Sequence, residues 1–174
     1  VRPEQAVLSD VNADLINVYS QVKTDHLELV RRLKLLPVSP EQYYLLRDED
    51  PVDPTDRAVR FLYLNRTAFG GIYRLNRDGR FNVPYGGGRR GIDILWRGDL
   101  LSRSSAALAG TEVLPRDFQL SLREAQPGDV VYCDPTYTVS HEDNAFRRYN
   151  ERNFAWADQI RLAKAAKEAA RRGV

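Results

Sequence analysis

The residues best suited to chemistry are Asp134, Pro135 and Tyr137, which follow a β-branched run at residues 129–133. A carboxylate, a backbone carbonyl held by proline and an aromatic ring can together bind a planar ring that carries an amino group. Because Gly128 and Pro135 bound the run, it fits a buried central strand of an α/β sheet. Ligands bind beyond the carboxyl ends of such strands. An ordinary strand followed by a proline turn is the alternative.

A second acidic residue, Asp10, ends the strand predicted over residues 6–10. Asn12 can cap the helix that follows, whose apolar residues are Leu15, Ile16, Tyr19 and Val22. An acid between a strand and a helix is where α/β folds bind ribose hydroxyls. The spacing fits equally well with Asp10 as part of a capping turn.

The elements that must position these residues alternate between helices and short strands. The apolar spacing predicts helices over residues 25–36, 40–47, 56–69, 98–109 and 154–172, with a strand from residue 111 to 114. Two alternating runs, residues 72–76 and 80–84, flank an Asp-Gly turn and predict a hairpin. An arginine-bearing hairpin can enter a DNA major groove, because that groove admits a two-stranded ribbon.

Charge is unevenly distributed along the chain. Residues 57–104 contain ten arginines, no lysine and three aspartates, a net charge of +7, whereas residues 1–56 have a net charge of −5. Aromatic residues are interleaved with the arginines. Arginine with aromatics is typical of a surface that binds phosphates and stacks on bases. A solvated helix face, the alternative, would usually mix lysine with glutamate.

The composition also argues against several classes. We expect no membrane span and no secretory leader, because the chain has no apolar run of 18 residues and no charged-then-apolar start. A single cysteine, Cys133, excludes an intramolecular disulfide and fits a reducing compartment. The two histidines lie far apart in the sequence, which gives little support to a zinc site.

In their order along the chain, these blocks resemble the Dam-type N6-adenine DNA methyltransferases. The matching blocks are residues 8–16, 61–67, 69–74, 79–84, 117–118 and 131–137, with Phe146, Tyr149 and residues 154–159. The resemblance implies a seven-stranded, Rossmann-like α/β sheet of the S-adenosylmethionine-dependent methyltransferases, incomplete here because the glycine-rich donor loop is expected before residue 1. It assigns residues 1–19 and 98–174 to the catalytic domain and residues 20–97 to an inserted target-recognition region of helices and a β-hairpin.

The resemblance also implies a role for individual residues. The catalytic residues would be Asp134, Pro135 and Tyr137, and the residues binding S-adenosylmethionine would be Asp10 for its ribose and Asp117 and Phe118 for its adenine. The DNA-binding residues would be Arg74 at a guanine, Arg66 and Arg89 at phosphates, Ile72 and Pro84 at a thymine methyl, and Phe69 beside the flipped base. Thr136 replaces a proline of the usual catalytic motif, and Gly70 replaces a frequent asparagine.

The activity implied is transfer of a methyl group to N6 of a flipped adenine in double-stranded DNA, with GATC as a frequent site in the family. No metal and no covalent intermediate is required. The resemblance implies a monomer in the cytoplasm of a bacterium or a phage host, working at the nucleoid and without a membrane. Two alternatives remain: a non-catalytic DNA-binding module, and methylation of another exocyclic amine such as cytosine N4.

Overall fold

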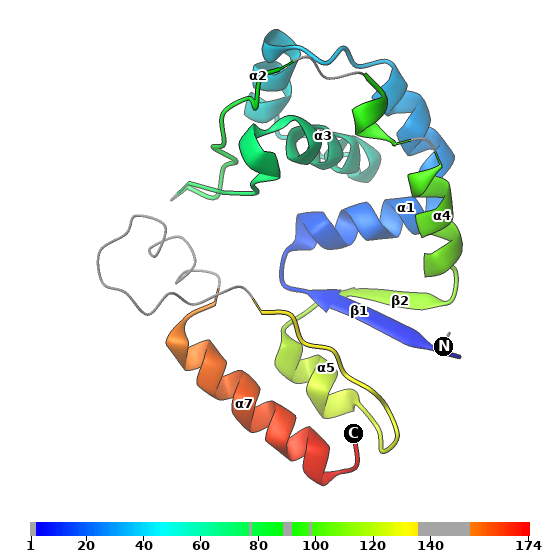
Figure 1. Cartoon of the computed structure of the whole chain (residues 1–174), viewed down its shortest axis with the longest axis vertical. Helices are drawn as coiled ribbons and strands as arrows, with labels where there is room; N and C mark the ends of the chain where they lie inside the picture. The colour runs from blue at the N-terminus through cyan, green and yellow to red at the C-terminus, as the bar shows by residue number, and fades with distance from the viewer. Residues whose placement is uncertain (1–2, 77, 89–91, 98, 136–153) are drawn as a thin grey trace. The chain divides into compact units, whose positions relative to one another are not determined.

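A computed structural model of the chain describes residues 3–76, 78–88, 92–97, 99–135 and 154–174 (Figure 1). The chain divides into two compact units, Val1–Pro115 and Arg116–Val174. The division of the chain into a catalytic domain and residues 20–97 as an insertion stays a prediction.

The first unit contains a parallel pair of strands, β1 (Ala6–Asp10) and β2 (Thr111–Pro115). Their register places Ala6 opposite Thr111 and Asp10 opposite Pro115, so both strands end at the same edge. Both strands were predicted from the sequence. Figure 1 shows α1 (Ala13–Lys34) running across the pair, with α4 (Leu100–Leu108) beside it.

Helix α1 begins as predicted at Asn12, whose side-chain oxygen accepts hydrogen bonds from the backbone N–H groups of Asp14 and Leu15, both at 3.1 Å. The helix is interrupted at Asp25, where φ is −151° and ψ is 60°. The Asp25 carboxylate accepts the backbone N–H of Glu28 at 3.2 Å, as an N-cap does. The second helix predicted from residue 25 is therefore present as the continuation of α1 beyond this break.

Helices α2 (Pro40–Asp48) and α3 (Pro54–Thr67) each begin with a proline that follows a capping side chain, Ser39 and Asp53 respectively. They pack with α1 around the main core of the unit. Its largest fully buried side chains are Tyr43, Tyr63, Leu29, Leu33 and Leu64. A short 3₁₀ helix, η1 (Phe69–Gly71), follows α3, and a second, η2 (Ile92–Leu95), precedes α4.

The predicted hairpin is present, but its paired segments are shorter than expected. Leu75 forms an antiparallel bridge with Phe81, and the backbone N–H of Asn82 donates to the carbonyl oxygen of Arg74 at 3.0 Å. The Asn76 side-chain oxygen accepts the backbone N–H groups of Asp78 and Arg80, both at 2.9 Å. The side chain of Asn76 thus stabilises the turn that the Asp-Gly pair predicted.

The second unit contains α5 (Phe118–Glu124) and α7 (Trp156–Arg171), which pack side by side (Figure 1). Their common core consists of Leu122, Ala165 and Ala169. The long C-terminal helix was predicted from residue 154 to 172. The structure confirms it and ends it before Gly173, whose φ of 93° is left-handed.

The prediction of a buried central strand over residues 129–133 is wrong for the described chain. Residues 129–135 have no regular structure, and Val130 and Tyr132 are 95% and 86% exposed. A β-branched run forms a strand only where neighbouring backbone accepts and donates its hydrogen bonds. Among the described residues the only sheet is the pair of β1 and β2, so the segment lacks such a neighbour.

The sheet of the described residues has two parallel strands, and the predicted seven-stranded Rossmann-like sheet stays a prediction. The mixed α/β class is confirmed. None of the described helices has the length and apolar character needed to cross a membrane.

Candidate active site and nucleic-acid interface

The base of the hairpin is held to helices α2 and α3 by hydrogen bonds. The backbone N–H of Phe69 donates to the carbonyl oxygen of Pro84 at 3.0 Å, and that of Gly86 donates to the carbonyl oxygen of Thr67 at 2.9 Å. The hydroxyl of Tyr43, on α2, donates to the carbonyl oxygen of Val83 at 2.9 Å. Because Tyr43 is fully buried, this bond fixes the segment after the hairpin to the helical core.

Aromatic packing reinforces this attachment along the hairpin itself. The Tyr73 ring lies 5.1 Å from that of Phe61 on α3 and 5.6 Å from that of Phe81 across the hairpin, measured between centroids. The rings of Tyr43 and Tyr85 lie 5.4 Å apart. These ring contacts hold the hairpin against the helical core, so its outer side chains project from a backbone that is fixed in position.

Arg74, the predicted guanine-reading residue, is held by a neighbour across the hairpin. Its Nε donates to the side-chain oxygen of Asn82 at 2.8 Å, and one terminal nitrogen donates to the Asn82 carbonyl oxygen at 3.2 Å. These two bonds use two of the five N–H donors of the guanidinium, so donors remain for a further acceptor.

The predicted apolar DNA contacts lie close to this arginine in the chain and are exposed. Phe69 is 60% exposed and Ile72 is 37% exposed, and Pro84 is also exposed. Between them Gly70 has φ of 62° and ψ of 8°, in the left-handed region. Asparagine is one of the few side chains that adopts this conformation readily, which explains physically why Gly70 can replace it.

The arginine-rich block divides into structural and outward-facing members. Arg57 forms an ion pair with Asp14, and Arg60 donates from Nε and a terminal nitrogen to the carbonyl oxygens of Leu46 and Arg47 at 2.7 and 2.8 Å. These two α3 side chains therefore bind other parts of the protein.

Arg66, a predicted phosphate-binding residue, lies in the last turn of α3 and is half-buried. Burial lowers the pKa of its guanidinium, and the positive charge of Arg97 lowers it further. Two cationic groups therefore lie near each other here. The other predicted phosphate-binding residue, Arg89, lies outside the described residues.

Asp10, predicted to bind the donor ribose, occupies the carboxyl end of β1. Its Oδ1 accepts the backbone N–H of Asn12 at 2.7 Å. The structure thus confirms the capping-turn interpretation for one oxygen of this carboxylate. The half-buried carboxylate lies at the edge where β1 and β2 both end, and one oxygen in a turn does not prevent the other from binding a hydroxyl.

Asp117 and Phe118, predicted to hold the donor adenine, occupy the start of α5. Asp117 is the N-cap and accepts the backbone N–H of Gln119 at 2.9 Å. A terminal nitrogen of Arg161 lies 3.0 and 3.1 Å from the two Asp117 carboxylate oxygens. The Arg161 guanidinium carbon also lies 5.0 Å from the centroid of the Phe118 ring. One arginine of α7 therefore contacts both predicted adenine-binding residues.

The predicted catalytic residues lie at the edge of the described chain. Asp134 and Pro135 are exposed, and Tyr137 lies outside the described residues, as does Thr136. The segment that leads to them begins at a fixed point, because the backbone N–H of Gly128 donates to the carbonyl oxygen of Gly173 at 2.8 Å. The roles assigned to Asp134, Pro135 and Tyr137 remain predictions.

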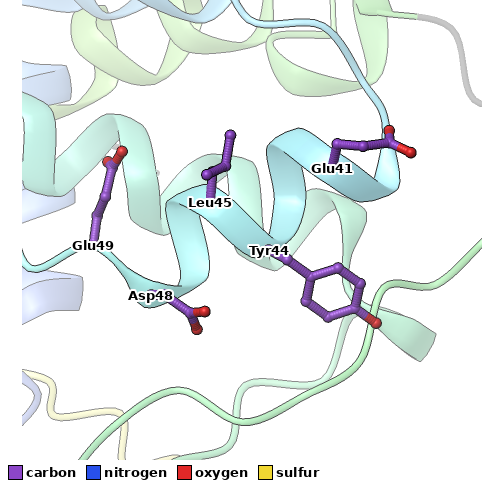
Figure 2. Close-up of a pocket in the computed structure, with 5 residues that line it drawn as sticks. All are labelled: Glu41, Tyr44, Leu45, Asp48 and Glu49. Carbon is purple, nitrogen blue, oxygen red and sulfur yellow. The ribbon is translucent and has the colours of Figure 1, made fainter.

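A surface hollow of about 530 Å³ lies along α2, and none of the five residues that line it is a predicted site residue. Figure 2 shows the five side chains that line it: Glu41, Tyr44, Leu45, Asp48 and Glu49. Three carboxylates in one hollow repel phosphate. This face of the protein is therefore unsuited to nucleic acid, and the arginine-bearing hairpin is the better candidate interface.

Two residues of the candidate sites were missed from the sequence, Asn82 and Arg161. The hairpin register could have indicated Asn82, since a turn at residues 77–79 places it opposite Arg74. The partnership of Arg161 with Asp117 spans 44 positions and has no local signal. Only tertiary packing of α7 against α5 reveals it.

Comparison with known proteins gives a consistent result over the whole chain. The sequence model of a family described as D12 class N6 adenine-specific DNA methyltransferase matches residues 1–174. The Type II methyltransferase M1.LlaDCHI of Lactococcus lactis subsp. cremoris is 35% identical over 99% of this chain and 63% of its own length.

Two further relatives come from another bacterium and from a phage. The DNA adenine methylase of Serratia marcescens is 34% identical over 90% of this chain and 59% of its own length. The DNA N-6-adenine-methyltransferase of Escherichia phage P1 is 32% identical over 98% of this chain and 23% of its own length. The chain thus spans less than two thirds of the length of each of these relatives.

Proposed function

We propose that this chain, which belongs to the D12 class N6 adenine-specific DNA methyltransferase family, carries the catalytic motif and the DNA-reading hairpin of a sequence-specific adenine methyltransferase. The reaction is transfer of a methyl group from S-adenosylmethionine to N6 of an adenine flipped out of duplex DNA. The observation that carries the proposal is the arginine-bearing hairpin. Asn82 holds the Arg74 guanidinium, and a hydrogen bond from Tyr43 attaches the hairpin to the helical core.

The residues present fit the methyl donor at two places. Asp10 lies at the carboxyl edge of the parallel strands, where α/β folds bind ribose hydroxyls. Asp117 presents a carboxylate beside the Phe118 ring, a pairing suited to an adenine that carries an amine and a π face. When bound, S-adenosylmethionine supplies an electrophilic methyl group on a sulfonium.

The catalytic step belongs to Asp134, Pro135 and Tyr137. The Asp134 carboxylate and the Pro135 carbonyl each accept one hydrogen of the adenine amine, which draws the nitrogen lone pair out of conjugation with the ring. Positive charge develops on that nitrogen, and the carboxylate stabilises it. Tyr137 stacks on the flipped base, a contact worth roughly 1–3 kcal/mol, against a flipping cost of roughly a few kcal/mol.

The hairpin and the residues where it joins the helical core recognise the DNA sequence. Arg74 donates to O6 and N7 of a guanine, the commonest specific contact in the major groove. Ile72 and Pro84 contact a thymine methyl, and Phe69 lies beside the space that the flipped base leaves. A site of the GATC type contains both of these bases, and Arg66 and Arg89 add phosphate contacts that position the duplex.

Incubation of the full-length protein with S-adenosylmethionine and a GATC duplex tests the proposal. The expected result is N6-methyladenine in the digested product, detected by mass spectrometry of the nucleosides. DNA binding without any methyl transfer would instead indicate a non-catalytic binding module, and N4-methylcytosine would reassign the amine. We place the reaction on double-stranded DNA in the cytoplasm of a bacterium or a phage host, with the protein acting as a monomer.

A further inference from the structure

We infer that Arg161 is a positioning residue for the methyl donor, which fixes the carboxylate of Asp117 and the ring of Phe118 in the arrangement that selects an adenine. The inference rests on the proposed function, because it concerns the same donor site. All the residues involved lie in the second unit, residues 116–174.

The contacts of Arg161 converge on the start of α5. One terminal nitrogen lies 3.0 and 3.1 Å from the two oxygens of Asp117 and 2.8 Å from the side-chain oxygen of Gln119. The other terminal nitrogen is paired with Asp158, one turn earlier on α7. The guanidinium thus connects α7 to three acceptors and holds the Asp117 carboxylate in one orientation.

The same guanidinium also lies over the ring of Phe118, 5.0 Å from its centroid. The ring of Phe154 approaches Phe118 at 6.0 Å and an interplanar angle of 61°. An arginine on one face and a ring at the edge restrict the rotation of the half-buried Phe118. Carboxylate and ring are therefore oriented by one side chain.

Arginine is required at this position because of its planar fork. The guanidinium reaches Asp117 and Asp158 from different nitrogens and stacks on a ring at the same time, which a lysine ammonium cannot do. Asp158 is itself held in place, since its Oδ2 accepts the backbone N–H of Ala155 at 2.9 Å. The start of α7 thus provides a fixed support for Arg161.

This role is separable from the packing of the unit. Leu122, Ala165 and Ala169 form the contact between α5 and α7 without Arg161. The Arg161 side chain is 41% exposed and that of Asp117 is 35% exposed, so their ion pair contributes little to the free energy of unfolding. Loss of Arg161 is expected to leave the Asp117 carboxylate held only by the Gln119 backbone N–H, and so less firmly oriented, while the helices stay packed.

The test compares binding of two product analogues by isothermal titration calorimetry with the full-length protein. S-Adenosylhomocysteine carries a 6-amine, which can donate a hydrogen bond to the Asp117 carboxylate. S-Inosylhomocysteine carries a carbonyl oxygen at that position instead. The wild type is expected to prefer the amine form by about tenfold or more, the effect of one hydrogen bond to a charged group. Arg161→Met is expected to reduce that preference to about threefold or less, and Asp117→Asn to change it similarly.

A control and a milder variant keep the result interpretable. Arg171→Gln removes an exposed arginine from the last turn of α7 and is expected to keep the wild-type preference. Should Arg161→Met fail to fold, Arg161→Lys retains the charge and the aliphatic stem, and it is expected to lose most of the preference with an unchanged unfolding midpoint. In methyl-transfer assays, Arg161→Met and Arg161→Lys are each expected to raise KM for the donor and to leave KM for DNA unchanged.

Two results would overturn the inference, and they differ in what else they imply. A wild-type preference retained in folded Arg161→Met and Arg161→Lys removes the role of Arg161 but leaves the donor site in place. A wild type with no preference between the two analogues removes the assignment of Asp117 to the donor adenine, and the role of Arg161 with it.

Discussion

The guanidinium of Arg74 donates to Asn82 twice, from Nε to the side-chain oxygen at 2.8 Å and from a terminal nitrogen to the backbone carbonyl oxygen at 3.2 Å. The two residues lie across the hairpin from each other. A long side chain loses rotamer freedom when it binds a base, and Asn82 has already removed part of that freedom. The Arg74 side chain is therefore partly ordered before it binds the planar edge of a nucleobase.

Arg74→Ala is expected to reduce affinity for the cognate duplex by about 1–3 kcal/mol, the range for a bidentate arginine–guanine contact. Fluorescence anisotropy with a duplex containing 7-deazaguanine, which lacks N7, makes the measurement specific. The wild type should bind this duplex more weakly than the natural one, whereas Arg74→Ala should bind both equally.

Asn82→Ala is expected to weaken cognate binding through the same contact. A double-mutant cycle with Arg74→Ala should give a coupling of about 0.5 kcal/mol or more, because the two residues act together. Additive effects of the two substitutions would show that Asn82 does not support Arg74.

Tyr43→Phe is expected to destabilise the protein by about 1 kcal/mol, because it removes a buried hydrogen bond and leaves the Val83 carbonyl without this donor. Tyr44→Phe is the matched control, since Tyr44 is the next residue on α2 and is 40% exposed. Urea unfolding monitored by circular dichroism measures both. Equal effects of the two substitutions would contradict the role of Tyr43 in holding the hairpin base.

Gly70 should tolerate asparagine better than alanine. Its φ of 62° lies in the left-handed region, where alanine costs roughly 1–2 kcal/mol and asparagine less. A Cβ there would lie 3.5 Å from the Ile72 side chain, which is ordinary contact distance. Thermal unfolding should therefore show a lower midpoint for Gly70→Ala than for Gly70→Asn. The reverse order would show that space, not backbone conformation, selects glycine.

Stability at low pH should depend on Glu28. Hydrogen bonds from Arg31, and then from Arg32, lower the pKa of this carboxyl from its ordinary 4.5 to about 2. Because folding favours the ionised form, this stabilisation is present above about pH 4.5 and is lost as the pH falls towards 2. Arg32 also pairs with Asp53 and Asp56, so the network connects α1 to the start of α3.

Glu28→Gln should therefore flatten the dependence of the unfolding free energy on pH across this window. Glu168→Gln, at an exposed position of α7, is the control and should leave the curve unchanged. An unaltered curve for Glu28→Gln would remove this ion-pair network as a source of acid sensitivity.

Local signals predicted most of the helices and both described strands. Asn12 is the cap that its spacing indicated, and the Asp-Gly turn forms the hairpin that it predicted. Such features depend on residues close in the sequence, which is why they could be found without a structure. The run at residues 129–133 failed as a strand prediction because β structure depends on a distant pairing partner.

The candidate sites show the same division between local and distant information. The positions of Arg74, Ile72 and Pro84 on and beside the hairpin agree with the sequence, but the support from Asn82 and Tyr43 was not foreseen. On α3, Arg57 pairs with Asp14, and Arg60 binds the end of α2. Charge counts alone cannot distinguish an arginine that binds DNA from one that binds its own chain.

The most direct test of the central claim is methyl transfer by the full-length protein and its Asp134→Ala variant. Tritiated S-adenosylmethionine and a GATC duplex are used, with nucleoside mass spectrometry of the product and anisotropy for DNA binding. The account predicts N6-methyladenine from the wild type, and from Asp134→Ala a loss of transfer with DNA affinity largely retained. Undiminished N6-methyladenine formation by Asp134→Ala, or equal loss of transfer and DNA binding, would contradict it.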